Sequence, residues 1–254
     1  MLSLSLLCVF AFCAGLFDAA VGGGGLIQIP ALFNFLPSYP AVALFGTNKL
    51  AGACGTAFAA KSYLGRVKVP WLLVLPAVAS AFAMSFLGAA TVGAVPQRLI
   101  RPVVLALIIA MAIYTFVRKD FGAMQGERVH RPRDRATAML IGGAIGFYDG
   151  MFGPGTGSFL MFLFVRVFAF NFLQASACAK LVNLATNIAA LAFFIPTGNV
   201  LYQFALPMAA CNIAGALVGS RLALRYGTRF VRKLFLLMLL FLIAKLTYDT
   251  FLRA

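Results

Sequence analysis

The sequence predicts an all-α polytopic membrane protein with roughly 8–10 membrane segments. Of its 254 residues, 63% are hydrophobic and only 11% are charged, and the mean hydropathy is +0.97. A soluble domain of this size could not bury so much apolar surface, so lipid must be the solvent. Apolar stretches of spanning or near-spanning length follow one another along the whole chain, which excludes a single anchor on a soluble domain.

The apolar segments set the division of the chain. We expect them at residues 2–20, 25–36, 41–60, 69–92, 98–117, 136–152, 156–170, 176–196, 200–220 and 232–250. The one clearly polar connection suggests a first membrane repeat (1–117), a basic loop (118–135) and a second membrane repeat (136–254). The amino terminus lacks a basic n-region and a small-residue cleavage site, so we expect a retained membrane segment there.

The charge is strongly positive, at +15 from 21 Lys and Arg against 6 Asp and Glu. The basic residues cluster in short loops at 61–68, 118–135 and 221–233. This is the positive-inside pattern, so the charge indicates orientation and not a nucleic-acid partner. With these loops in the cytoplasm, both termini lie outside the cell membrane, and each half of the chain crosses the membrane an odd number of times. Arg98 and Arg101 are exceptions, because they fall on the non-cytoplasmic side.

Motifs of the first half recur in the second half at one fixed distance along the sequence, which we call the repeat offset. This offset carries Asp18 onto Asp149 and Lys49 onto Lys180. The same offset aligns Gly15, Gly22 and Gly24 with Gly146, Gly153 and Gly155. Halves with an odd number of crossings enter the membrane from opposite sides. We therefore expect two inverted repeats, the arrangement of many secondary transporters.

Four charged residues lie clearly inside apolar sequence: Asp18, Lys49, Asp149 and Lys180. A charge at the bilayer centre costs about 2.5–3.5 kcal/mol on insertion scales, so these residues are candidates for function. A purely structural interpretation stays open, in which each aspartate caps a broken helix or pairs with a lysine to stabilise the bundle.

A glycine-rich run follows each aspartate, "GGGG" at residues 22–25 and "GPGTGS" at residues 153–158. Such a run breaks a helix where lipid offers no water, and it survives only when buried in protein or lining a cavity. Free backbone N–H groups and the positive end of the restarting helix favour an anion there. Each half is therefore expected to contain a broken or re-entrant helix that forms an oxyanion cradle.

The lysine-bearing segments complete the predicted site with small polar side chains. The predicted substrate-binding residues are Gly22, Gly23, Gly24, Gly25, Thr47, Asn48, Lys49, Gly153, Gly155, Thr156, Gly157, Ser158, Lys180, Asn183 and Asn187. Asp18 and Asp149 are assigned to proton coupling or gating. For Asn187 and Thr186, ordinary hydrogen bonding between helices is an equally open interpretation.

Other noticeable residues are given structural roles, and we expect no metal and no cofactor. His130 is interpreted as a solvated loop residue. Gly215 and Gly219 indicate close helix packing, and Trp71 an interfacial anchor. The cysteines show no CxxC spacing and are interpreted as small packing residues: Cys8, Cys13, Cys54, Cys178 and Cys211.

Two motif pairs resemble the TauE/SafE family, also called the toluene sulfonate uptake permease family. They are "FDAAVGGGGLIQIPAL" with "GTNKL", and "GFYDGMFGPGTGSF" with "AKLVNLATN". The resemblance covers essentially the whole chain and is closest to the bacterial YfcA-like branch. It implies a multi-pass transporter of the bacterial inner (plasma) membrane for sulfite, sulfonates or related organic anions. The termini would be periplasmic and the 118–135 loop cytoplasmic.

We therefore expect a secondary transporter, and not an enzyme, that exports a small anion such as sulfite by proton-coupled alternating access. Its partners would be the anion, protons and membrane lipid. A passive anion channel is the alternative, and an intramembrane enzyme is a weaker one, because the sequence has no GxGD or HExxH motif. The exact substrate, export or uptake, the coupling ion and the oligomeric state, a homodimer included, stay open. So does the choice between re-entrant and fully spanning glycine segments.

Overall fold

The computed structural model describes residues 2–96, 99–100, 102–107, 109–110 and 132–226. Its helices are α1 (Leu2–Val21), α2 (Gly25–Phe35), α3 (Ala41–Leu64), α4 (Trp71–Val92), α6 (Pro132–Met151), α7 (Thr156–Phe168), α8 (Phe172–Phe194) and α9 (Tyr202–Tyr226). The described residues between 99 and 110 are helical too, and no described residue forms a strand. This confirms the predicted all-α class. His130, Arg98, Arg101, most of the 118–135 loop and segment 232–250 lie outside the described residues.

Helices α6 and α8 begin well ahead of the boundaries that hydrophobicity predicts. Helix α6 begins at Pro132, inside the segment expected to be the polar loop, because proline at the first helical position gives up no hydrogen bond. Helix α8 begins at Phe172, ahead of the apolar stretch expected from 176. Its N-cap Asn171 accepts a hydrogen bond from the Gln174 N–H at 2.9 Å, which fixes the start on polar residues.

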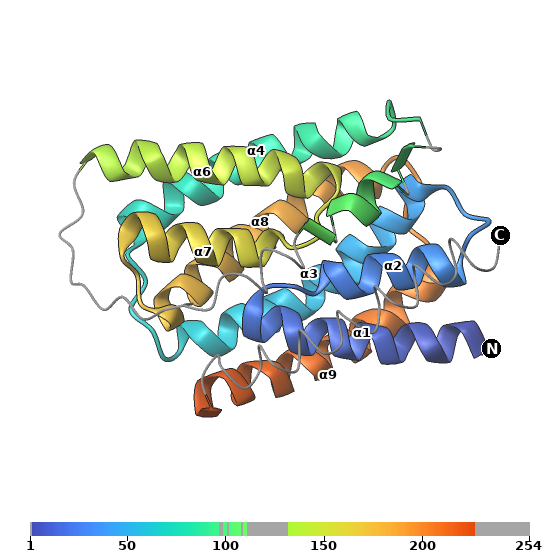
Figure 1. Cartoon of the computed structure of the whole chain (residues 1–254), viewed down its shortest axis with the longest axis horizontal. Coiled ribbons are helices and arrows are strands. Elements are labelled where there is room, and N and C mark those ends of the chain that lie inside the picture. The colour runs from blue at the N-terminus through green and yellow to red at the C-terminus, as the bar shows by residue number, and fades with distance from the viewer. Residues whose placement is uncertain (1, 97–98, 101, 108, 111–131, 227–254) are drawn as a thin grey trace.

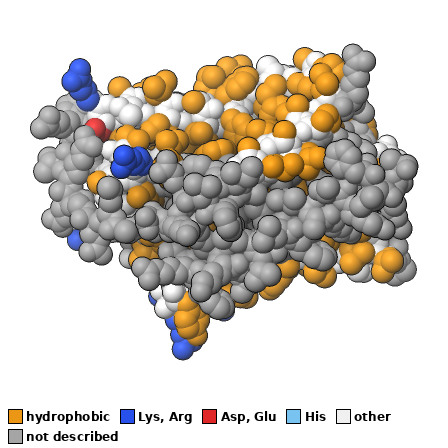
Figure 2. Space-filling view, in the orientation of Figure 1, with side chains coloured by type: hydrophobic (Ala, Val, Ile, Leu, Met, Phe, Trp, Pro, Cys, Tyr) orange, Lys and Arg blue, Asp and Glu red, His pale blue; other side chains and the backbone are white. Residues whose placement is uncertain are grey.

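The outer surface of the bundle is suited to lipid. Helices α1, α4, α8 and α9 are each long and apolar enough to cross a membrane. Large side chains on the outer helices are widely exposed, with 72% for Leu72, 74% for Leu140 and 60% for Leu206. Figure 2 shows such hydrophobic side chains over the described parts of one face. The chain is a multi-pass membrane protein.

Each glycine run is the turn of a helical hairpin. Helix α2 folds back along α1, so that the rings of Phe10 and Phe35 lie 5.9 Å apart (Figure 1). Helices α6 and α7 form the corresponding hairpin in the second half. Gly22 and Gly153 stand at the turns with φ angles of 81° and 87°, which residues other than glycine rarely adopt. The chain therefore turns back at both breaks and does not continue in the same direction.

The helices of the second half follow those of the first in order and length. Helices α1, α2, α3 and α4 correspond to α6, α7, α8 and α9, and under the repeat offset their starting positions coincide or differ by one. A proline interrupts both α4 and α9, at Pro76 and Pro207. Helices α1 and α6 run in opposite directions across the view of Figure 1.

The two hairpins meet at their tips. A Cβ atom added to Gly22 would lie 2.3 Å from the carbonyl carbon of Gly157. A Cβ added to Gly157 would lie 2.7 Å from the Gly22 Cα atom. The two breaks therefore come together inside the protein, beside the central helices α3 and α8, which pack against each other.

Glycines also bring whole helices into backbone contact on both sides of this centre. Along α1 and α9, a Cβ at Gly215 would lie 1.9 Å from the Phe12 carbonyl oxygen, and one at Gly219 would lie 2.1 Å from that of Leu16. This confirms the prediction of close packing at these two positions. Helices α4 and α6 pack in the same manner through Gly146 and Gly150.

The basic helix ends lie together at one end of the bundle. Lysine and arginine residues occur at the carboxyl ends of α3, α7 and α9 and at or just before the amino ends of α4 and α6. All five ends lie on the left in Figure 1, and blue side chains appear on the left and lower left in Figure 2. The amino end of α1 lies at the opposite end.

Replacing Gly215 by alanine should force α1 and α9 apart. Overpacking costs about 1–3 kcal/mol, and each kcal/mol lowers Tm by about 2–4 °C in a chain of this size. We expect Tm in detergent to fall by about 2–12 °C. Gly93→Ala is the matched control, because no atom lies within 4 Å of the added Cβ. Equal Tm values for the two variants would contradict the close packing.

Candidate functional site

Two buried ion pairs link the halves of the chain. Lys49 of α3 contacts the Asp149 carboxylate of α6, with 2.6 Å between Nζ and Oδ2. Lys180 of α8 contacts the Asp18 carboxylate of α1, with 2.7 Å between Nζ and Oδ2. Each lysine therefore binds the aspartate of the other half. The two pairs correspond to each other in the repeat, because the repeat offset carries Lys49 onto Lys180 and Asp18 onto Asp149.

These pairs are not expected to be retained for stability alone. Only 3% of the Lys49 side chain and 0% of the Lys180 side chain are exposed. Desolvating two charges costs about as much as their attraction contributes, and an apolar pair of similar volume is often at least as stable.

Asp18 and Asp149 each have a lysine partner and are not paired with one another. This arrangement is unlike the carboxyl dyad of an aspartyl protease.

A cavity of about 40 Å³ lies beside the hairpin tips. Its lining comes from both halves and consists of Asp18, Gly22, Gly24, Gly25, Gln28, Asn48, Lys49, Gly52, Thr56, Asp149, Gly153, Thr156, Gly157, Asn183, Asn187 and Asn212. At about 10–15 Å³ for each water-sized group, it has room for about three such groups. Its size therefore suits a small ligand.

Most residues predicted from the sequence meet at this cavity. The predicted residues that line it are Gly22, Gly24, Gly25, Asn48, Lys49, Gly153, Thr156, Gly157, Asn183, Asn187, Asp18 and Asp149. Five other predicted residues lie outside the lining: Gly23, Thr47, Gly155, Ser158 and Lys180. For Thr47, Ser158 and Lys180, the contacts show what the side chain does instead.

Thr47 and Ser158 satisfy backbone groups. The Thr47 hydroxyl donates to the Ala43 carbonyl at 2.7 Å and accepts from the Leu201 N–H at 3.0 Å. The Ser158 hydroxyl donates to the Val21 carbonyl at 2.7 Å, and the Ser158 N–H donates to the Gly22 carbonyl at 3.1 Å. Ser158 therefore ties α7 to the end of α1, where carbonyl groups have lost their helical partners.

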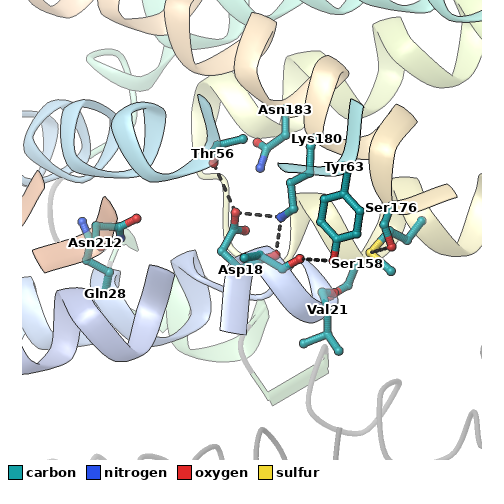
Figure 3. Close-up of polar contacts among 12 residues, drawn as sticks. Asp18, Val21, Gln28, Thr56, Tyr63, Ser158, Ser176, Lys180, Asn183 and Asn212 are labelled. Atoms are coloured by element: carbon teal, nitrogen blue, oxygen red, sulfur yellow. Dashed lines mark hydrogen bonds and ion pairs between the residues drawn. The ribbon is translucent and has the colours of Figure 1, made fainter. Parts of the chain in front are cut away.

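Lys180 has a similar role at the same helix end. Besides its ion pair, its ammonium donates to the Asp18 backbone carbonyl, and Tyr63 donates to the neighbouring Ala19 carbonyl at 2.9 Å. Figure 3 shows Lys180 beside the Asp18 carboxylate. A cation at a helix carboxyl end is favoured by the helix dipole. Lys180 therefore caps α1 as well as neutralising Asp18.

Lys49 is placed differently, because it lines the cavity. Its one hydrogen bond within the described part of the chain goes to Asp149, whereas an ammonium group has three donors. The other Asp149 oxygen accepts from the Thr156 hydroxyl at 2.6 Å. Two Lys49 N–H donors are therefore available to a ligand.

Uncharged donors surround the same space. The side-chain amides of Asn48, Asn183 and Asn187 line the cavity and make no hydrogen bond within the described residues. The backbone N–H groups of Gly24 and Gly25, at the amino end of α2, have no acceptor there either. Together with Lys49, these groups can donate several hydrogen bonds to a small anion.

Sequence reasoning missed four lining residues: Gln28, Gly52, Thr56 and Asn212. Thr56 donates to the Asp18 carboxylate at 3.2 Å. Gln28 and Asn212 are uncharged amides within apolar segments, at "LIQIP" and "ACNIA". A search for buried neutral amides, besides charges, would have identified both.

Comparison with known proteins gives a match over nearly the whole chain. The family described as "Sulfite exporter TauE/SafE" matches residues 7–246. The chain is 38% identical to "Probable membrane transporter protein YfcA" of Escherichia coli, covering 98% of this chain and 91% of that protein. It is 35% identical to "Probable membrane transporter protein ORF9" of Sinorhizobium sp, covering 97% and 93%. A Haemophilus influenzae "Probable membrane transporter protein" is 32% identical, covering 97% and 95%. No solved structure matches the chain.

A double-mutant cycle should show that the ion pairs join the two halves. Lys49→Met leaves Asp149 buried and unpaired, which costs about 3–5 kcal/mol. We expect Asp149→Asn to restore much of the lost Tm in the Lys49→Met background. Asp18→Asn, the matched control, should restore little. Equal rescue by the two asparagine variants would contradict the pairing.

Proposed function

The chain belongs to the TauE/SafE family, and from this we propose that it is a secondary transporter that exports a small anion, sulfite or another sulfur-containing anion. The observation that carries the proposal is a cavity between the two halves, in which Lys49 and several amides have free N–H donors. A site between two repeats that move against each other is the usual arrangement of secondary transporters.

The class of ligand follows from the lining. An anion would accept hydrogen bonds from Lys49, from asparagine amides and from backbone N–H groups at the start of α2. The positive dipole end of α2 adds to this preference. A cavity of about 40 Å³ suits a compact oxyanion such as sulfite better than an aromatic sulfonate.

The ion pair between Lys49 and Asp149 gives a route to proton coupling. In the empty site, the lysine ammonium and the carboxylate form an ion pair. A bound anion competes for the same ammonium, and the carboxylate that loses this partner is then favoured to take up a proton. Anion and proton would thus bind together and cross in the same direction. Because an inward proton gradient opposes export of both, the anion's own concentration gradient and remaining negative charge would drive the export. Asp18 and Lys180 form a second pair of this kind, held more firmly by the bond to the α1 backbone.

Alternating access would use the two halves as inverted repeats. The common order of helices, the constant offset between their starts and the opposite directions of α1 and α6 support this arrangement. Because each ion pair joins one half to the other, loosening a pair on anion binding would release the halves to move. The basic helix ends support a cytoplasmic location for that end of the bundle.

Loss of either lysine should abolish sulfite transport, for different reasons. Lys49→Ala removes the charge that binds the anion, so we expect transport in proteoliposomes to fall about 100-fold or more. Both changes leave an aspartate without its lysine and should lower Tm, and Lys180→Ala also removes the α1 cap. Lys61→Ala, at the basic end of α3, is the control and should retain transport. Full activity in both the Lys49 and the Lys180 variant would overturn the proposal.

Asp149→Asn should separate anion movement from proton movement. The amide cannot exchange a proton, so we expect sulfite-driven acidification or alkalinisation of liposomes to disappear while sulfite still binds. A pH-sensitive dye inside the liposomes measures this, with Asp134→Asn at the basic end as control. Unchanged proton flux in Asp149→Asn would refute coupling through this residue. If the wild-type protein passed sulfite far faster than the turnover of a carrier allows, a passive anion channel would instead be favoured.

A further inference from the structure

One buried donor beside the cavity has no partner. Gln28 is 1% exposed, and its Nε2 atom makes no hydrogen bond within the described part of the chain. Among the described residues, no other buried side-chain nitrogen or oxygen atom lacks a hydrogen-bond partner. Buried polar groups are nearly always bonded, because an unpaired one loses its hydration without return. An unpaired donor in a cavity wall therefore indicates a missing acceptor.

The orientation of this amide is fixed by a neighbour. The Asn212 side chain, 3% exposed, donates from Nδ2 to the Gln28 Oε1 atom at 2.9 Å. This bond occupies the Gln28 carbonyl and leaves the NH₂ group as its free side. Both residues line the cavity with Lys49. In the view of Figure 3 they lie to the left of Asp18, with Lys180 to its right.

We propose that Gln28 is a specificity residue whose Nε2 group donates a hydrogen bond to an oxygen of the bound oxyanion, and that Asn212 positions it. This inference rests on the proposed anion site and names a recognition element within it. Lys49 supplies charge, which attracts any anion. The fixed amide of Gln28 adds a directional donor, so it selects an anion with an oxygen acceptor at that point.

The amide pair has no counterpart in the second half. The repeat offset places Phe159 at the position of Gln28 and Ala81 at the position of Asn212. Phe159 packs against Tyr148, with 5.8 Å between ring centroids. The directional donor therefore belongs to one repeat only. The Lys49 ammonium instead lies beside the second glycine break, 3.3 Å from where a Cβ atom of Gly153 would stand. The two donors therefore place a single anion between the two breaks.

The test is calorimetric titration of the purified full-length protein in detergent, with sulfite and sulfate as probes. Gln28→Leu should raise the Kd for the bound anion about tenfold or more, because a hydrogen bond to a charged group is lost. Gln28→Glu keeps the acceptor for Asn212 but removes the donor and adds a negative charge, so binding should disappear. Gln203→Leu, the same change on an exposed residue of α9, should leave Kd unchanged.

The positioning role of Asn212 has its own readout. Asn212→Ala alone should raise Kd, but it should add no further rise in the Gln28→Leu background, since the amide that it orients is gone. A further rise in that background would show that Asn212 acts independently and would overturn its positioning role.

The outcomes separate this inference from the proposed function. Wild-type protein that binds neither sulfite nor sulfate would overturn the oxyanion site, and with it this inference. Wild-type protein that binds an anion with the same Kd as a folded Gln28→Leu variant would overturn this inference alone. A lower Tm with unchanged Kd in Gln28→Leu would give Gln28 a structural role and would also overturn it.

Discussion

Backbone groups that are freed inside a membrane must find partners within the protein, and this constraint shapes the centre of the molecule. Helix α1 ends at Val21. Lipid provides no water there to bond the last carbonyl groups of the helix. Tyr63 and Ser158 donate to its Ala19 and Val21 carbonyls. Lys180 donates to the Asp18 carbonyl, which also accepts from the Gly22 N–H. These three side chains come from three other helices. The break can therefore exist only where α3, α7 and α8 converge. The cavity lies at the same point, and Gly24 and Gly25 at the start of α2 form part of its wall.

The two halves share their order of helices, but their corresponding residues have different roles. Both lysines pair with an aspartate of the opposite half, at 2.6 and 2.7 Å. Lys180 also caps a helix and lies outside the cavity lining, whereas Lys49 lines it with donors to spare. Gln28 faces the same cavity, and its counterpart in the repeat is an aromatic residue. In our interpretation, one half mainly recognises the anion and the other mainly holds the hairpin tips in place.

The sequence predicts the fold class well and locates the four charges that lie within apolar segments, because both depend on local patterns. Apolar segment length locates the helices, and charges inside such segments identify Asp18, Lys49, Asp149 and Lys180. The pairing across halves could not be predicted, because it depends on how the hairpins cross. The same limit applies to Ser158, which looked like a ligand group beside glycine and serves the Val21 carbonyl instead. Gln28 was missed because a single neutral amide gives little signal in sequence.

In the proposed mechanism, an anion takes Lys49 from Asp149, which then gains a proton. Infrared difference spectroscopy of the purified protein, with and without sulfite, tests it most directly. We predict that sulfite binding produces a carboxylic-acid C=O band, absent in Asp149→Asn, together with uptake of about one proton for each anion bound. Sulfite binding without that band and without proton uptake would show that Asp149 stays ionised. That result would contradict the coupling mechanism.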